Sequence, residues 1–341
     1  MKTNDFSLLL TTFFSKYLPG QRNLSMNTID SYRTSFVLLL DYYSSTFDIK
    51  PDRLQMKDFS QERVFSFLDW IEEERNCCVS TRNQRLAAVK SFFTYVSAKS
   101  PENLMLCQQI AAIPQKRTSQ KPLLYFSPEG TEKLLSMPDI STWIGRRDHA
   151  ILVLTYDSAA RVQELIDIKE EDIRTELPAT VTLFGKGRKT RTTPLSSTTA
   201  MIINSFLSEK KHRFDSNQDS LLFVNSRGGK FTRVGIAGIL DKYVKKMKDS
   251  GFSEFVPGPV SPHSLRHGKA VHLLRSGVPL IYIRDFLGHS SVTTTEIYAT
   301  IDSEQKRMAI ENAIQIPVQK SSIDWEADKN LKDWLVDLCS K

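Results

Sequence analysis

Two short segments of the chain place arginine, histidine and tyrosine side chains close together in sequence. Residues 263–267 read His-Ser-Leu-Arg-His, and His289 follows a Leu-Gly pair nine positions before Tyr298. Arginine can fork onto two phosphate oxygens, histidine can move protons near neutral pH, and tyrosine can attack phosphorus to form a covalent ester. With Arg161 upstream, these residue types suit phosphoryl transfer in which arginines neutralise the charge of the phosphate.

A basic turn supplies a further group for such chemistry. Residues 180–184 alternate in a β manner, residues 185–191 read Gly-Lys-Gly-Arg-Lys-Thr-Arg, and residues 192–195 follow as a return strand. We therefore expect a β-hairpin with Lys186 at its tip, where an ammonium group could protonate a leaving oxygen. The neighbouring basic side chains could contact a polyanion such as DNA rather than take part in the chemistry; they are Arg188, Lys189 and Arg191. The sequence has no carboxylate cluster of the kind that holds a metal ion, so we expect no metal site.

These motifs resemble the signature of the tyrosine recombinases of the phage integrase family, especially its compact Xer and mobile-element members. That signature combines Gly-x-Arg-x-x-Glu-Leu, a hairpin Gly-Lys-Gly, His-x-x-Arg, Leu-Gly-His and a tyrosine. The chain departs from it at Ala159, where the family usually has glycine, which eases a tight backbone approach. The resemblance covers residues 123 to about 312, and it implies the catalytic set Arg161, Lys186, His263, Arg266, His289 and Tyr298, with Tyr298 as nucleophile.

Several residues of these motifs also have an ordinary structural interpretation. Arg161 could simply pair with Glu164, which we expect to orient Arg161 or its helix. His267 is expected to support the site rather than to act directly. Tyr282 competes with Tyr298 for the role of nucleophile, and its spacing from the Leu-Gly-His motif is less suitable.

The elements that must position these residues fall into two parts. Apolar residues recur at helical spacing around residues 29–43, 64–71 and 86–96; Ser25 or Asn27 could cap the first helix and Ser80 the third. Residues 1–113 thus read as a helical domain, which the resemblance identifies as the SAM-like core-binding domain. Residues 114–122 are polar, basic and bounded by prolines, as in an exposed linker. Residues 123–318 form the mixed α/β catalytic domain, with a further short strand at residues 221–224. We expect a mainly α fold with a small hairpin sheet, clamped around DNA.

Charge favours a polyanionic partner. The 341 residues contain 46 Lys and Arg and 39 Asp and Glu, a net charge of +7. We expect DNA contacts from Arg82, Arg85 and Lys90, which lie off the apolar stripe of the third helix, and from Lys116 and Arg117 in the linker. Phosphate contacts of this kind would make DNA binding fall steeply with salt.

Composition narrows the class of protein further. Hydrophobic residues make up 40% and charged residues 25% of the chain, which is ordinary globular usage. A membrane span needs roughly 20 apolar residues in a row, and the chain has no such run. The N-terminus has no signal-peptide pattern, and the four cysteines lack Cys-x-x-Cys spacing. We expect reduced thiols in a cytoplasmic protein that contacts no membrane and associates with the bacterial nucleoid when bound to DNA.

The resemblance implies a site-specific recombinase that works without ATP, metal or other cofactor. It would cut duplex DNA at an inverted-repeat core site through a 3′-phosphotyrosine intermediate and a four-way junction. Its partners would be that DNA, three further copies in a homotetramer formed on DNA from monomers or weak dimers, and an accessory recombinase or DNA-bending protein. The tail, residues 319–341, would dock on its own or a neighbouring protomer through an apolar stripe of Trp325, Leu331, Trp334, Leu335 and Leu338.

Several biological roles fit this chemistry. We favour integration, excision or transposition of a mobile element. An Xer-type resolvase of chromosome or plasmid dimers is the main alternative. A type IB topoisomerase-like enzyme and a non-catalytic DNA-binding factor are more distant ones.

Overall fold

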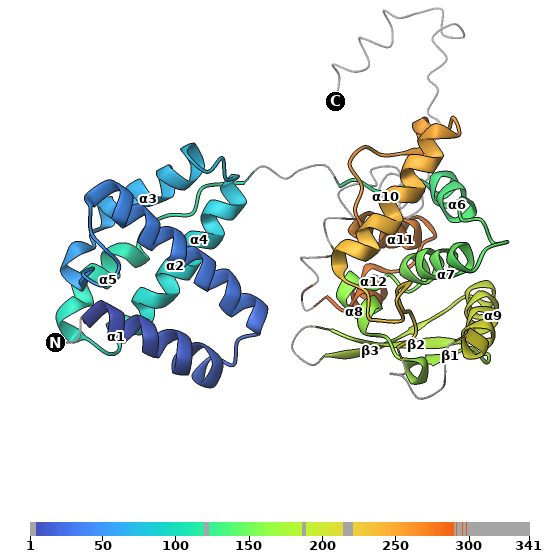
Figure 1. Cartoon of the computed structure of the whole chain (residues 1–341), viewed down its shortest axis with the longest axis horizontal. Helices are drawn as coiled ribbons and strands as arrows, with labels where there is room; N and C mark the ends of the chain where they lie inside the picture. Colours follow the sequence, from blue (N-terminus) through green and yellow to red (C-terminus); the bar gives the residue numbers. More distant parts are fainter. Residues whose placement is uncertain are drawn as a thin grey trace, which may run out of the picture. The chain divides into compact units, whose positions relative to one another are not determined.

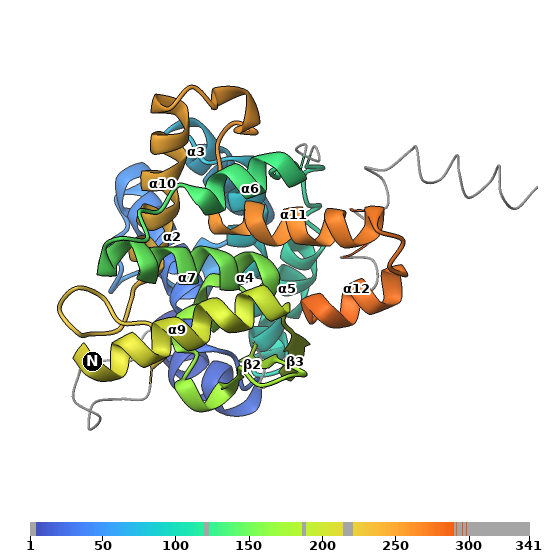
Figure 2. The same cartoon turned by 90° about the vertical axis from the view of Figure 1, so that its right-hand side faces the viewer.

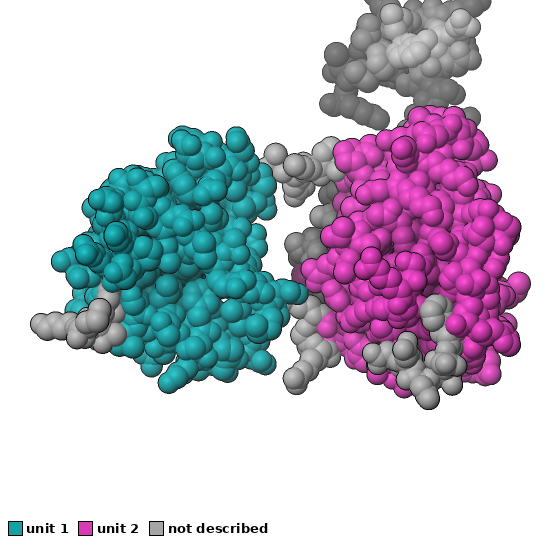
Figure 3. Space-filling view, viewed as in Figure 1, with its two compact units in different colours: residues 1–122 teal, residues 123–341 magenta. Residues whose placement is uncertain are grey.

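The computed structural model describes residues 5–118, 123–185, 189–213 and 221–289, together with Ser291, Thr295 and Tyr298. The chain divides into two compact units, Met1–Pro122 and Leu123–Lys341 (Figures 1 and 3). Helices dominate both units, and the second contains one small sheet. The expected two-domain, mainly α fold is therefore confirmed. Among the described helices, none has the length and apolar character needed to cross a membrane.

The first unit is an all-helical bundle arranged around α4. Its elements are α1 (Asp5–Thr12), the π-helical η1 (Phe13–Gln21), α2 (Met26–Phe47), η2 (Met56–Asp58), α3 (Gln61–Glu73), α4 (Val79–Ser97), η3 (Pro101–Asn103) and α5 (Leu104–Ala111). Ser25 caps α2 by accepting a hydrogen bond from the Thr28 amide, as predicted. The expected cap at Ser80 is wrong, because the N-cap of α4 is Cys78, two residues earlier, and Ser80 lies within the first turn.

Helix α4 is buried on more than one side. It contacts α2, α3 and α5, and its predicted apolar stripe is fully covered. Phe92 and Tyr95, which lie outside that stripe, are also buried. A helix enclosed in this way has little solvent-facing surface, so its basic side chains are buried or half-buried.

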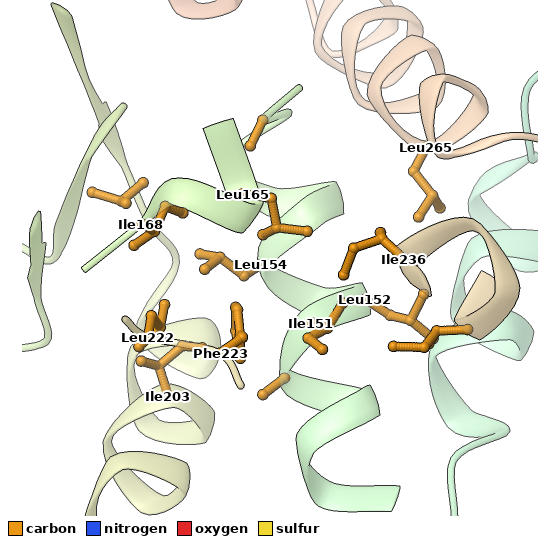
Figure 4. Packing of buried hydrophobic residues seen from close by; sticks show 14 of the residues in the cluster. Ile151, Leu152, Leu154, Leu165, Ile168, Ile203, Leu222, Phe223, Ile236 and Leu265 are labelled. Carbon is orange, nitrogen blue, oxygen red and sulfur yellow. The ribbon is translucent and has the colours of Figure 1, made fainter. Parts of the chain in front are cut away.

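The second unit mixes helices with the sheet. Its elements are α6 (Pro128–Ser136), α7 (Trp143–Asp157), α8 (Val162–Asp167), η4 (Glu170–Asp172), β1 (Ile173–Arg174), β2 (Thr180–Phe184), β3 (Thr190–Pro194), α9 (Ser197–Arg213), α10 (Arg233–Asp249), η5 (Ser253–Phe255), α11 (Pro262–Arg275) and α12 (Leu280–Leu287). Helix α7 contacts both α9 and α11 and runs between them (Figure 2). Its apolar residues meet side chains from α8, α9, α10 and α11 in one core (Figure 4).

The predicted hairpin is present as strands β2 and β3 of an antiparallel sheet with the order β1-β2-β3. Leu183 pairs with Arg191 across the two strands, and the Gly185 amide donates to the Lys189 carbonyl at 2.8 Å. The strand expected at residues 221–224 is wrong: the described chain has only isolated bridges there, from Leu221 and from Val224. Leu222 and Phe223 of this segment are buried in the hydrophobic core of the second unit, so their hydrophobicity reflects packing rather than sheet pairing.

Candidate active site

Three arginines converge on the C-terminal end of α12. The last carbonyls of an α-helix lack partners within the helix and carry its partial negative charge, so they attract cations. Here three successive carbonyls each accept a hydrogen bond from a different guanidinium: Phe286 from Arg191 Nε at 3.1 Å, Leu287 from Arg266 Nη2 at 2.5 Å, and Gly288 from Arg161 Nη2 at 3.3 Å. One helix end therefore sets the spacing of all three arginines.

The carboxylate of Glu164 joins two of these arginines. Its Oε1 accepts from Arg161 Nη1 at 2.7 Å and from Arg191 Nη1 at 2.8 Å. Its Oε2 accepts from the Arg161 amide at 2.8 Å and from Arg191 Nη2 at 2.7 Å. Burial alone would raise the pKa of Glu164, which is 4% exposed, but the hydrogen bonds from Arg191 and Arg161 outweigh burial and lower the pKa to about 2. Glu164 is thus ionised throughout the physiological range, and the expected contact with Arg161 is present.

Arg266 is the most deeply placed of the three arginines, at 3% exposure. Burial, followed by the charges of Arg161 and Arg191, lowers its pKa to about 9. Its Nη1 donates to the Ala159 carbonyl at 2.5 Å. Ala159, the residue that departs from the family glycine, has a left-handed backbone with φ of 47°. The chain therefore keeps, with an alanine, a conformation that normally favours glycine.

Two histidines lie around the arginines. His263 follows Pro262 in the first turn of α11, and burial, then the charges of Arg266 and Arg161, lower its pKa. The same causes lower the pKa of His289 to about 4. His289 Nδ1 lies 3.0 Å from Thr295 Oγ1. Both imidazoles are therefore neutral near pH 7, and each can offer a hydrogen bond to an anion without adding charge.

Tyr298 lies inside this cluster with its hydroxyl held by His267. The side chain of Tyr298 is fully buried, and its oxygen lies 2.8 Å from His267 Nδ1. Burial raises the pKa of Tyr298, although Arg266 and Arg161 act to lower it. Burial also lowers the pKa of His267 to about 4. The competing Tyr282 is 65% exposed on α12. His267 thus contacts the Tyr298 hydroxyl directly.

The basic residues of the hairpin have different surroundings. Lys186 and Arg188 lie outside the described residues. Lys189 is exposed. The expected DNA contact at Arg191 needs correction, because its side chain is 12% exposed and its three guanidinium nitrogens are all hydrogen-bonded within the unit. A sequence signal for this existed: Arg191 pairs across the hairpin with the buried Leu183, so it faces inward.

The expected DNA contact at Arg82 is also wrong. Arg82 is 2% exposed, and its Nε lies 3.2 Å from Glu72 Oε2. A phosphate could reach this guanidinium only if the side chain left the interior of the bundle. Arg85 and Lys90 are half-buried, and they donate to the Ser31 carbonyl at 3.0 Å and to the Ala111 carbonyl at 2.6 Å. These cations chiefly join α4 to its neighbouring helices.

The start of the basic linker is fixed to the first unit. The Asn83 side chain exchanges two hydrogen bonds with the backbone of Lys116, at 2.8 and 3.1 Å. The Lys116 ammonium pairs with Glu72, and Asp69 lies 3.9 Å away. Arg117 is exposed. Of the five basic residues expected to meet DNA from this unit, Lys116 and Arg117 are the two exposed ones, and Lys116 is engaged in an ion pair.

Comparison with known proteins identifies the family. The model of the phage integrase family matches residues 125–305, more than half of the chain. The chain belongs to the phage integrase family. The model of the N-terminal SAM-like domain of phage integrases matches residues 12–99. The chain is therefore a tyrosine recombinase, a member of a class of enzymes that cleave and rejoin DNA at specific sites, and the resemblance drawn from its motifs is confirmed.

Relatives extend over nearly the whole chain. The putative integrase/recombinase y4rC of Sinorhizobium fredii is 34% identical over 96% of this chain and 96% of its own length. The tyrosine recombinase XerC of Roseiflexus sp. is 32% identical over 85% of this chain and 88% of its own. Among solved structures, the Tn1549 transposon integrase in complex with a circular intermediate DNA has a TM-score of 0.69 at 15% identity, covering 92% and 100% of the two chains. The XerH recombinase bound to its difH substrate has a TM-score of 0.65 at 21% identity, covering 85% and 81%. These two share the fold.

Proposed function

We propose that this recombinase cuts duplex DNA by attack of Tyr298 on the scissile phosphate. The phenolic oxygen forms a bond to phosphorus, the bond from phosphorus to the 5′-oxygen breaks, and the products are a 3′-phosphotyrosine and a 5′-hydroxyl. The phenolic proton passes to the neutral imidazole of His267, whose Nδ1 lies 2.8 Å from the phenolic oxygen. Lys186 protonates the leaving 5′-oxygen. Attack by the 5′-hydroxyl of a partner strand then reverses the chemistry and releases Tyr298.

The arginine cluster is the observation that carries this proposal. Three guanidinium groups and one carboxylate leave a net charge of +2 at the end of α12, with Tyr298 beside them. Of the three arginines, Arg161 has the most exposed side chain, at 34%, and it can turn its remaining donors to a phosphate. The buried Arg266 adds positive charge near the phosphate, and the neutral His263 and His289 can donate hydrogen bonds to it. A site of this kind stabilises the extra negative charge of a pentavalent phosphorus.

Integration, excision or transposition of a mobile element is the role that we propose for this reaction. The relative y4rC, which aligns over almost the full length of both chains, carries the name of a putative integrase/recombinase. Dimer resolution is the second candidate, because relatives named XerC and XerD align at 32% and 31% identity. In both roles the enzyme would act on DNA in the cytoplasm, on an inverted-repeat site, as a tetramer. The apolar stripe of the tail, which would join protomers, lies outside the described residues.

Trapping of covalent protein–DNA adducts in cells tests the proposal. Wild type, Tyr298→Phe and Tyr282→Phe would be compared, and the attached DNA sequenced. We expect adducts with wild type and Tyr282→Phe but none with Tyr298→Phe. Adducts at the ends of a mobile segment support integration or excision, whereas a single chromosomal site supports dimer resolution. Adducts scattered over the genome would indicate topoisomerase-like activity, and adducts that persist in Tyr298→Phe would refute the assignment of the nucleophile.

A further inference from the structure

We propose that Arg191 is a positioning residue for strand cleavage: it fixes the guanidinium of Arg161 and keeps the positive charge of Arg161 available to the scissile phosphate. The proposal rests on the function proposed above and extends the same site. It replaces the role of DNA contact that the sequence suggested for Arg191. At 12% exposure, this side chain is turned away from solvent and toward the other charged groups.

The hydrogen bonds of Arg191 define a fixed geometry. Its two terminal nitrogens form a fork onto both oxygens of Glu164, at 2.8 and 2.7 Å, and Nε donates to the Phe286 carbonyl at 3.1 Å. A bidentate arginine–carboxylate pair sets both the direction and the rotation of the carboxylate. The same two oxygens hold the side chain and the amide of Arg161. The orientation of Arg161 is therefore set through Glu164 by Arg191.

Charge gives a second reason for this arrangement. If Glu164 were paired with Arg161 alone, the carboxylate would cancel the positive charge that a phosphate has to meet. With Arg191 on the other side of the carboxylate, the group of three carries a net charge of +1. Glu164 can then hold Arg161 rigidly without neutralising it. Lysine at position 191 could supply the charge but not the fork.

Arg191 also connects the hairpin to the site. It lies on β3, the return strand of the hairpin, and its carboxylate partner lies on α8. A methyl group added at Gly185, on the other arm of the hairpin, would lie 3.2 Å from Glu164 Oε1. A methyl group added at Gly288, where φ is +62°, would lie 2.9 Å from Arg191 Cδ. The absence of side chains at both glycines thus allows the hairpin, the Glu164 carboxylate and Arg191 to pack closely together.

Single-turnover cleavage tests the proposal. The substrate is a duplex carrying the site mapped by adduct sequencing, with a nick beside the scissile phosphate so that the cut strand cannot be rejoined. The variants are Arg191→Gln, Arg191→Lys and the double variant Glu164→Gln/Arg191→Gln. Arg174→Gln is the matched control, because Arg174 is exposed on β1 of the same sheet. Thermal unfolding and DNA affinity are measured for each, and cleavage is repeated on a methylphosphonate duplex, which lacks one negative charge at the scissile position.

We expect Arg191→Gln to slow adduct formation at saturating DNA by about 100-fold, the effect of a small misplacement of a catalytic group, with DNA affinity unchanged. Arg191→Lys should recover part of the rate. Removing Glu164 as well should make the double variant faster than Arg191→Gln, because the uncompensated carboxylate is gone. The deficit of Arg191→Gln should also narrow on the methylphosphonate duplex.

Three results separate the possible failures. A wild-type rate in Arg191→Gln would overturn the proposal. An equal loss on both duplexes, together with lower thermal stability and no recovery in the double variant, would make Arg191 a purely structural residue and would also overturn it. Absence of adduct with wild type would instead overturn the proposed function, and the role of Arg191 with it.

Discussion

Replacing Glu164 by glutamine removes one negative charge and little volume from a carboxylate that is 4% exposed and accepts four hydrogen bonds from two arginines. The pKa of Glu164 falls from 4.5 to about 2 in the folded chain. At about 1.4 kcal/mol per pKa unit, this fall corresponds to about 3 kcal/mol of folding free energy. Breaking a buried ion pair from one side typically costs about 3–5 kcal/mol, which agrees.

Denaturant and thermal unfolding measure this cost. At pH 7 we expect Glu164→Gln to lower the unfolding free energy of the second unit by about 3 kcal/mol and its melting temperature by about 6–12 °C. Because the folded-state pKa lies below the unfolded one, the stabilisation is complete above about pH 4.5 and is lost as the pH falls toward 2. The difference between variant and wild type should therefore stay constant from pH 8 to 5 and shrink at lower pH.

Glu171→Gln is the control for a surface charge. Glu171 is 69% exposed and has one ion pair, to Lys169 at 3.2 Å, so its replacement should change the unfolding free energy by less than about 1 kcal/mol. If Glu164→Gln were as stable as this control, the reasoning about a shared, buried carboxylate would be refuted.

Further outcomes follow from other contacts. Ala159→Gly should change the unfolding free energy by less than about 1 kcal/mol. Glycine relieves about 1–2 kcal/mol of left-handed backbone strain, but the variant loses a buried methyl group worth about 0.8 kcal/mol and has a more flexible unfolded chain. A large gain in unfolding free energy in a urea titration would contradict this balance. Arg117→Gln should reduce the slope of log affinity against log salt by about 1 and leave the melting temperature unchanged. Arg82→Gln should lower the melting temperature of the first unit and leave the salt slope unaltered. The reverse pattern in DNA titrations and thermal unfolding would refute the exposed position of Arg117 and the buried position of Arg82. Burial keeps His267 neutral in the folded chain, with a pKa of about 4. The contribution of His267 to stability therefore falls as the pH drops below its pKa in the unfolded chain, near 6.5. His267→Gln should flatten the loss of unfolding free energy between pH 7 and 5, and an unchanged dependence of unfolding free energy on pH would show that His267 titrates normally.

The sequence was most informative where local spacing and chemistry agree. The cap at Ser25, the hairpin strands and the pairing of Arg161 with Glu164 all depend on residues that are neighbours in the chain or face each other across one turn. The two-domain, mainly α architecture followed from helical periodicity and a polar linker, together with the family resemblance. These features need no knowledge of how distant elements pack.

The errors arise where packing between distant elements decides. Arg82 lies off the apolar stripe of α4, and a helix with one buried face would expose it; because α4 is enclosed by three helices, the arginine is buried against Glu72. Arg191 lies among basic residues in the sequence, but its partners are 27 and 95 residues away. The segment at residues 221–224 is apolar enough for a strand, but it forms only isolated bridges, and its buried side chains pack in the core of the second unit. The pairing of Arg191 with Leu183 across the hairpin indicates that this side chain faces inward, but a local pattern does not identify the distant partners of Arg82 or Arg191.

The site also depends on the exact length of α12. Since successive residues of a helix are about 100° and 1.5 Å apart, a single residue inserted into α12 would rotate the three terminal carbonyls away from their guanidinium groups together, and His289 with them. Point changes on the exposed face of this helix should be tolerated, but a change of its length by one residue should abolish strand cleavage completely. Homologous enzymes that keep this site are therefore expected to vary in the composition of α12 and to conserve its length.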